Sequence, residues 1–274
     1  MCQIFAMSSK APAAVTFAFS GFSARGGITG EHQDGFGLAF HHGRACRVFV
    51  DELPAGEAAL AGFLRSHPIR AQVVVGHVRK ATQGEVALVN CHPFVREWRG
   101  RYWSFCHHGD LKAFEPLLSG PYRPVGSTDS ERAFCWILQE LDLLFRWDED
   151  LPWRVLAREL AALAEDIGQH GNFNFLLSDG ESLFVRAATR LHCVERQHPF
   201  PRVQLVDRDL GMDLAVANHP GDRMTLVATE PLTRDEPWQA LEPGELLVLR
   251  EGSCVERLLP RAAQRRASAL SGGA

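Results

Sequence analysis

The sequence predicts an α+β protein with antiparallel sheets, and three observations favour that fold class. Short apolar segments typical of buried strands lie before residue 108 and return after residue 172. Two long segments with a helical spacing of apolar residues, 129–145 and 151–167, lie between them. Because strands and helices do not alternate in regular βαβ units, a doubly wound parallel sheet is not favoured.

Five short segments in the first half are expected to be buried strands, because each is apolar or aromatic-rich and most are bounded by Gly, Pro or charged residues. They are 2–7, 35–40, 45–50, 71–78 and 102–107. Residues 55–65 carry apolar residues at helical spacing, which predicts a first helix among these strands.

The helix at 129–145 is predicted from its start and from its apolar face. The segment Ser127-Thr128-Asp129-Ser130-Glu131 is typical of a helix cap. A further helix is expected at 151–167, and Ser178-Asp179-Gly180-Glu181 is typical of a hairpin turn. The strands expected in the second half are 173–178, 182–187, 191–196, 213–217, 224–229 and 245–250.

Composition and charge restrict the class of protein. The chain has 274 residues, of which 46% are apolar and 23% charged, so it carries enough apolar material for a core. Its 29 basic and 33 acidic residues give a formal net charge of -4, which disfavours nucleic acid as a partner. No stretch approaches ~18 continuous apolar residues, so no helix is expected to cross a membrane.

The cysteines and the chain ends indicate where the protein resides and how many domains it has. Seven cysteines without short-range spacing are typical of cytosolic thiols, and the first residues lack the features of a signal peptide. We therefore expect a cytoplasmic protein. Since no Pro-, Gly- or Ser-rich linker divides the chain, a single domain is expected over 1–260, followed by a small, polar and flexible tail over 261–274.

Cys2 is a candidate nucleophile because of its position. Removal of the initiator methionine would place a thiol and a free α-amine on one residue. An α-amine has an unperturbed pKa of about 7.7–8.0, so it can accept the proton of the thiol at neutral pH. On position alone, a buried apolar cysteine that opens a strand is the alternative interpretation.

Five polar clusters follow predicted strands or open predicted helices, where functional loops are common. Most of them combine a glycine with a side chain that can recognise charge. They are His32-Gln33-Asp34-Gly35-Phe36-Gly37, the run GHVRKATQG over 76–84, Asn90-Cys91-His92-Pro93-Phe94, Phe105-Cys106-His107-His108-Gly109-Asp110-Leu111 and Gly126-Ser127-Thr128-Asp129-Ser130-Glu131.

With Cys2 and these clusters in this order, the sequence resembles the class II, Ntn-type glutamine amidotransferases, and especially their small stand-alone members. The resemblance continues to Ala228-Thr229-Glu230-Pro231-Leu232-Thr233 and Glu236-Pro237-Trp238. It implies the Ntn-hydrolase αββα sandwich, a four-layer fold in which helices flank two stacked antiparallel sheets. It leaves no part of the chain for a fused synthase domain.

The resemblance also implies roles for individual residues. Cys2 would be the nucleophile, and Arg79 would bind the α-carboxylate of glutamine through its bidentate guanidinium. Asp129 would pair with the α-ammonium group, and Thr82 would add hydroxyl or main-chain contacts. Taken singly, Arg79 could equally be a paired arginine at a strand end and Asp129 a helix N-cap.

Further motif positions are expected to support the site through turns and buried hydrogen bonds rather than to react. They are His32, Asp34, His77, Asn90 and His92.

One position departs from the family pattern. The family motif His-Asn-Gly supplies an oxyanion hole from the Asn side chain and the Gly main-chain N–H, whereas this chain has His107-His108-Gly109. Gly109 keeps its N–H. His108 would either replace the Asn as a donor through a ring nitrogen or leave a slow or repurposed amidase, since loss of one oxyanion donor costs ~10²–10³ in rate in a protease.

Neither a metal nor another cofactor is expected. Cys91-His92 and Cys106-His107-His108 form no Cys-x-x-Cys knuckle, and neighbouring residues on a strand point to opposite faces. The chain has no phosphate-binding loop of the type G-x-x-x-x-G-K-[ST], so ATP-dependent chemistry is not expected of it.

Three functions fit these residues. The first is hydrolysis of the side-chain amide of glutamine, or of a close γ-glutamyl amide, through a γ-glutamyl thioester on Cys2. The second is removal of a γ-glutamyl group from a larger amine. The third is a catalytically weakened, glutamyl-binding regulatory subunit of a synthetase, which His108 suggests. A separate synthetase or ammonia acceptor is the partner that the first and third functions would use.

Overall fold

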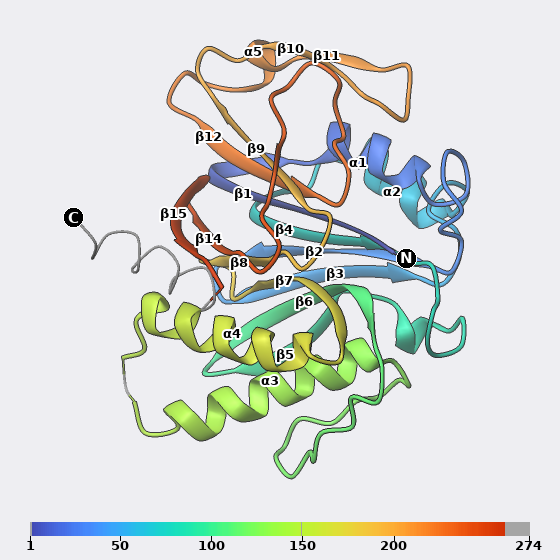
Figure 1. Cartoon of the computed structure of the whole chain (residues 1–274). Helices are drawn as coiled ribbons and strands as arrows, with labels where there is room; N and C mark the ends of the chain where they lie inside the picture. Colours follow the sequence, from blue (N-terminus) through green and yellow to red (C-terminus); the bar gives the residue numbers. More distant parts are fainter. Residues whose placement is uncertain (1, 149, 261–274) are drawn as a thin grey trace, which may run out of the picture.

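A computed structural model of the chain describes residues 2–148 and 150–260, and it has four layers (Figure 1). Helices α1 (Thr16–Ala24) and α2 (Ala59–Ser66) cover the outer face of a seven-stranded sheet. A six-stranded sheet lies against its inner face, and α3 (Asp129–Phe145) and α4 (Trp153–Gly168) cover the opposite side. The predicted α+β class and the αββα sandwich implied by the family resemblance are both confirmed.

All strand pairs within the two sheets are antiparallel. The seven-stranded sheet has the order β13 (Gln239–Ala240), β9 (His192–Gln197), β12 (Arg223–Ala228), β1 (Gln3–Ala14), β4 (Arg70–Val78), β2 (Phe36–His42) and β3 (Ala45–Asp51). The six-stranded sheet has the order β15 (Ser253–Leu258), β14 (Leu246–Arg250), β8 (Leu183–Arg186), β7 (Gly171–Ser178), β6 (Arg101–Leu111) and β5 (Phe94–Trp98).

Alternation along the strands fills three apolar layers. On β6, Phe105 points toward α3 and stacks on Phe134, with ring centroids 5.0 Å apart. The next residue, Cys106, points the other way into the layer between the sheets, where it meets Ile4 and Val75. Residues of β6 therefore face either the helices or β1, and this alternation decides which of its polar residues can reach Cys2.

Most predicted elements are confirmed within a few residues, but the strand expected at 213–217 is wrong. Residues Leu214–Ala217 form a single helical turn, α5, because the Asp213 carboxylate accepts a hydrogen bond from the Ala215 N–H at 3.0 Å. A short apolar run does not distinguish a strand from a helical turn, so the side chain that caps it decided the outcome.

Several elements were not predicted. Helix α1 is buried along most of its length, so it lacks the polar face that would mark a helix, and it has no capping side chain. The remaining strands lie at sheet edges or in a separate two-stranded ribbon and are short or weakly alternating. They are β5, β10 (Arg202–Gln204), β11 (Gly211–Asp213), β13 and β15.

Two further expectations concern the chain as a whole. No helix within residues 2–148 and 150–260 is both long and apolar enough to cross a bilayer. The tail expected at 261–274 lies outside the residues that the structure describes.

Candidate active site

Cys2 lies immediately before β1, next to the end of β4. Gln3 pairs with Val78, so the thiol lies beside the chain that leaves β4. The Lys80 main chain holds it on two sides: the Lys80 N–H donates to Sγ at 3.3 Å, and Sγ donates to the Lys80 carbonyl at 3.2 Å. Burial raises the pKa of the Cys2 thiol, although the Lys80 hydrogen bond and the Arg79 charge oppose this. The thiol therefore needs a base before it can attack.

Arg79 is a buried cation without a counterion among the described residues. It is only 2% exposed, and its guanidinium donates to the carbonyls of Asp34 (3.4 Å), Gln83 (3.2 Å) and Gly84 (3.2 Å). No carboxylate of the described chain lies within ion-pair distance of it. Since an uncompensated buried charge is costly, this arrangement favours the binding of an anion.

Asp129 is the first residue of α3, and its carboxylate faces the end of β6. It accepts hydrogen bonds from the Leu111 N–H at 2.8 Å and from the Ser130 N–H at 2.9 Å. The interpretation of Asp129 as an N-cap is wrong, because Thr128 caps the helix by accepting from the Glu131 N–H at 3.1 Å. Asp129 is thus free of the capping role that was the alternative to substrate binding.

Arg79 and Asp129 lie near the thiol with opposite charges. Both act on the pKa of Cys2, the arginine lowering it and the carboxylate raising it. A buried thiol with a cation and an anion nearby is suited to a zwitterion that carries both charges and a reactive group.

Gly109 lies on β6, and the strand register determines where its main-chain N–H points. Lys112 N–H donates across the pair to the His170 carbonyl at 2.8 Å, whereas Leu111 N–H turns to Asp129 instead. Because antiparallel pairs alternate in this way, Gly109, two residues before Leu111, also directs its N–H away from β7. On the other side β5 begins only opposite Phe105. Strand pairing among the described residues therefore leaves this N–H available.

The Gly109→Ala substitution is expected to destabilise the protein. A Cβ at this position would lie 1.7 Å from the Asn172 carbonyl oxygen, so β6 and β7 would have to separate. Overpacking of this kind costs about 3 kcal/mol, which corresponds to a fall in Tm of about 5–10 °C. Thermal unfolding checks this, with Gly168→Ala as the matched control, since nothing lies within 4 Å of its Cβ. Equal Tm values for the two variants would contradict the prediction.

His108 and Asn90 make direct hydrogen bonds near Cys2 and α3. His108 Nδ1 donates to the Cys2 carbonyl. Asn90 Nδ2 donates to the Glu85 carbonyl at 3.0 Å, and its Oδ1 accepts from the Ser127 N–H at 2.9 Å. Asn90 thereby ties the loop that follows Arg79 to the start of α3.

Asp34, His32 and Thr82 lie on the loops around the thiol. The Asp34 carboxylate accepts from the Ala81 N–H at 2.7 Å, and His32 Nδ1 donates to the Arg25 carbonyl at 3.2 Å. Each of these side chains thus bonds to the main chain of another loop residue. Thr82 is exposed.

The expected buried hydrogen bonds are not formed by His77 and His92. Their rings stack with centroids 4.1 Å apart, and none of the four ring nitrogens has a hydrogen-bond partner among the described residues. Burial holds the pKa of both side chains well below the usual value, so both are neutral. They form a buried pair of neutral stacked rings, close enough to Arg79 for its charge to lower the pKa of both.

These neutral histidines make stability depend on pH. Burial also lowers the pKa of His41 and His108 to about 4. The unfolded chain takes up a proton at each histidine as the pH falls through about 6.5, while the folded chain does not, so stability is lost on acidification. Each such histidine is expected to remove about 2 kcal/mol of unfolding free energy between pH 7 and pH 5.

Urea unfolding at pH 7 and pH 5 measures this loss. The His41→Gln variant is expected to lose about 2 kcal/mol of the pH dependence. An unfolding free energy that is the same at both pH values would show that the histidines are charged in the folded protein.

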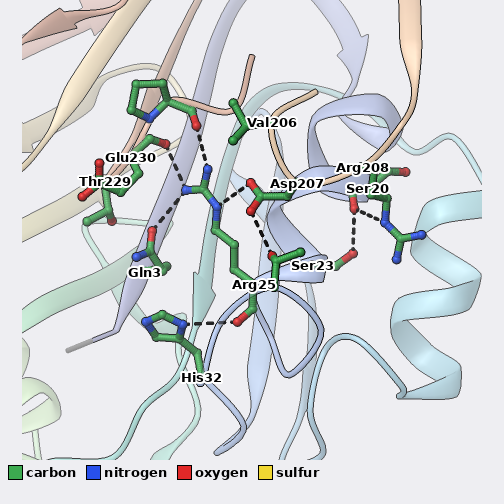
Figure 2. Close-up of polar contacts among 12 residues, drawn as sticks. Gln3, Ser20, Ser23, Arg25, His32, Val206, Asp207, Arg208, Thr229 and Glu230 are labelled. Carbon is green, nitrogen blue, oxygen red and sulfur yellow. Dashed lines mark hydrogen bonds and ion pairs between the residues drawn. The ribbon is translucent and has the colours of Figure 1, made fainter. Parts of the chain in front are cut away.

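Sequence reasoning missed Arg25, which lies at the centre of the network in Figure 2. Its buried guanidinium pairs with Asp207 at 2.8 Å and donates to Gln3 Oε1 at 3.2 Å. It also donates to the carbonyls of Glu230 (3.0 Å) and Pro231 (2.6 Å). Arg25 thus fixes the residue next to Cys2 to two distant loops. Nothing in the local sequence marks it, because Gln3 is 22 positions away along the chain and its other partners are 182 to 206 positions away.

Gln83 was also missed. Its Nε2 donates to Asp110 Oδ1 at 2.6 Å and to the Leu111 carbonyl at 3.0 Å, while its own carbonyl accepts from Arg79. It therefore joins the Arg79 loop to the end of β6. Its position within GHVRKATQG was the one available signal.

No group of three or more His, Cys, Asp or Glu in the described part of the chain is placed to hold a metal ion.

Comparisons with known proteins identify the family. The family model of the class-II glutamine amidotransferases matches residues 1–271 of this chain. YafJ of Escherichia coli (strain K12), provisionally named a glutamine amidotransferase, is 42% identical over 247 residues, which cover 89% of this chain and 96% of YafJ. The crystal structure of a predicted glutamine amidotransferase from Pseudomonas aeruginosa is 37% identical, with a TM-score of 0.74 over 93% of this chain and 100% of that one.

A more distant structure shows the fold alone. The glutamine phosphoribosylpyrophosphate amidotransferase of B. subtilis is 14% identical, with a TM-score of 0.57 over 94% of this chain and 49% of that one. Its similarity supports an Ntn-type arrangement of the two sheets. The nearer relatives and the match along residues 1–271 lead to one conclusion: this chain belongs to the class II glutamine amidotransferase family.

Proposed function

We propose that this protein is an amidohydrolase that uses Cys2 to hydrolyse the side-chain amide of glutamine or of a γ-glutamyl amide. The observation that carries the proposal is the pair of buried charges around the thiol. Arg79, which has no counterion in the described chain, would bind the α-carboxylate, and Asp129 would bind the α-ammonium group. The γ-carbonyl would then lie at Cys2 Sγ, with Thr82 adding a hydroxyl at the rim.

The first step needs a base, because the thiol of Cys2 is protonated. Removal of the initiator methionine would free the Cys2 α-amine, which takes the thiol proton. Sγ then attacks the γ-carbonyl carbon, and the developing oxyanion rests on the Gly109 N–H. Collapse of the tetrahedral intermediate breaks the C–N bond. The protonated α-amine returns the proton to the leaving nitrogen, so ammonia or an amine departs and a γ-glutamyl thioester remains.

The second step consumes water. The α-amine removes a proton from a water molecule, and the resulting hydroxide attacks the thioester carbonyl. The C–S bond breaks, glutamate leaves and the thiol is restored. No metal or other cofactor is required. We place this chemistry in the cytoplasm, since all seven cysteines are free thiols.

The remaining motif residues would support the site. Asp34 and Asn90 brace the loop that follows Arg79, and His32 fixes the main chain at Arg25. His77 and His92 form a buried pair of stacked rings. We further propose that residues 1–260 act as one catalytic domain, which the family match over 1–271 supports.

A single labelling experiment tests the proposal. The purified protein is treated with a γ-diazoketone analogue of glutamine, and its intact mass and peptide masses are measured alongside ammonia release from glutamine. We expect one adduct per chain on Cys2, an N-terminus that begins at Cys2, and release of ammonia. An unlabelled Cys2 together with no ammonia would instead favour a glutamyl-binding subunit of a synthetase.

The leaving group is a separate question, because Arg79 and Asp129 would contact only the glutamyl part. Lys80, whose main chain holds the thiol, pairs its side chain with exposed Glu31 at 2.6 Å. These charged groups at the rim could contact a polar amine larger than ammonia. Comparison of kcat/KM for glutamine and for γ-glutamyl amides of polar amines decides whether the leaving group is ammonia or a larger amine. A higher value for the larger amides would identify a γ-glutamyl hydrolase.

A further inference from the structure

His108 occupies the position where the family motif has Asn, and its ring makes a contact that restricts its chemistry. Nδ1 faces the Cys2 carbonyl. Because a main-chain carbonyl only accepts hydrogen bonds, the proton must be on Nδ1. A neutral imidazole has one N–H, so Nε2 carries a lone pair and cannot donate to an oxyanion. Burial lowers the pKa of His108 to about 4, so the ring remains neutral between pH 6 and pH 8.

The main chain beneath this ring is held from the opposite side. His108 pairs with Asn174 across β6 and β7, and Asn174 Nδ2 donates to the His108 carbonyl at 2.8 Å. Asn174 is completely buried, and its Oδ1 accepts from the N–H groups of Ala188 and Thr189 at 2.8 Å. The ring is therefore presented to Cys2 from a fixed point of the sheet.

The neighbouring ring of His107 cannot take over as a donor. Its Nε2 donates to the Asn172 carbonyl at 3.0 Å, and its Nδ1 accepts from the Ser130 hydroxyl at 2.8 Å. It also points toward α3, because neighbouring residues of a strand face opposite sides. Neither histidine of the pair offers an N–H that is free for the reaction.

The Cys2 carbonyl depends on the His108 N–H as its hydrogen-bond donor, because strand pairing does not provide one. The pairing of β1 with β4 begins at Gln3 and Val78, so the Cys2 carbonyl lies outside it. The thiol of the same residue is held by Lys80. His108 and Lys80 thus fix Cys2 at two points, the carbonyl and the sulfur, and this determines the direction in which Sγ faces.

We propose that His108 is a positioning residue that holds Cys2 through its main-chain carbonyl, and that the oxyanion rests on the Gly109 N–H without a side-chain donor at position 108. The second half rests on the proposed function, because an oxyanion forms only if Cys2 attacks an amide. The first half does not, since it concerns the placement of the thiol alone.

Two reactions of Cys2 separate these roles. Alkylation by iodoacetamide needs a well-placed thiol but develops no oxyanion, whereas hydrolysis of glutamine needs both. Loss of positioning in His108→Ala is expected to slow alkylation of Cys2 about 5- to 100-fold. His108→Asn supplies a side-chain amide donor and is expected to raise kcat about 10-fold, since one oxyanion donor is worth ~10²–10³ and the lost contact offsets part of the gain.

Controls keep the test specific. His67→Ala removes an exposed ring whose Nδ1 lies 3.2 Å from the Phe63 carbonyl at the end of α2, and it should change neither rate. His108→Leu, which fills the space of the ring but has no N–H, replaces the alanine variant if that one does not fold. The dependence of the hydrolysis rate on pH between pH 6 and pH 8 should be the same in the wild type and in His108→Asn.

The outcomes are distinct. Alkylation of His108→Ala at the wild-type rate, together with a loss of hydrolysis, would identify His108 as an oxyanion donor and overturn the proposal. A kcat of His108→Asn no higher than that of the wild type would overturn its second half. Slowed alkylation in a protein whose wild type hydrolyses no glutamyl amide would support the positioning role and refute the proposed function.

Discussion

The Cys2→Ala and Cys2→Ser variants are expected to release ammonia from glutamine at least ~10³-fold more slowly than the wild type, as losses of a nucleophile do in other hydrolases. Alanine removes the attacking group. Serine keeps the geometry but presents a hydroxyl, which is much harder to deprotonate than a thiol. Coupled measurement of ammonia and glutamate over time provides the rates.

Cys106→Ala is the matched control for the nucleophile. Cys106 is a fully buried thiol on β6 that points into the apolar layer between the sheets, and burial, together with the nearby Cys2, raises its pKa. Its loss should alter stability and leave the chemical step in place. If Cys2→Ala retained full activity, the nucleophilic mechanism would be abandoned.

Arg79→Met is expected to lower kcat/KM for glutamine by about 30-fold to several thousand-fold, because loss of one partner from a buried charge pair costs about 2–5 kcal/mol. The loss should lie mainly in KM, since the carboxylate stays bound to the arginine throughout the reaction. Arg79→Lys keeps the charge but loses the planar fork, so it should recover only part of the affinity.

Two further measurements distinguish a binding role for Arg79 from a structural one. Iodoacetamide, which carries no carboxylate, should alkylate Cys2 of Arg79→Met at nearly the wild-type rate, while the γ-diazoketone analogue should label it much more slowly. Arg65→Met is the matched control, because Arg65 also donates to a main-chain carbonyl, that of Ala55, but lies on α2. Equal loss of both labelling reactions would mean that Arg79 only maintains the fold.

The fold was largely predictable because its central strands are short, apolar and well bounded. The segments predicted as β2, β4, β7, β12 and β14 agree with the structure within two residues at each end. The elements that were missed or wrongly predicted are short, and their apolar and polar residues follow no clear pattern. Helix α1 lacks a polar face, and the turn at Leu214–Ala217 depends on one hydrogen bond from Asp213. Neither the missing polar face nor this hydrogen bond is visible in the spacing of apolar residues along the chain, on which the predictions depend.

The sequence indicates residues for the candidate site but not their geometry. Motif order indicated Cys2, Arg79 and Asp129, and the structure places both charges near the thiol. The direction of the His108 ring and the missing partners of His77 and His92 were not predictable, because they depend on contacts between separate strands. Arg25 could not be found at all, since its role exists only once four separate segments have met.

The position of β1 in the middle of its sheet has a consequence for the order of events during synthesis. Its neighbours are β4, which ends at Val78, and β12, which ends at Ala228. Synthesis from the N-terminus therefore provides β1 with one neighbour early and with the other only after about 150 further residues have been made. The seven-stranded sheet cannot close around the strand that follows Cys2 until that late segment is present.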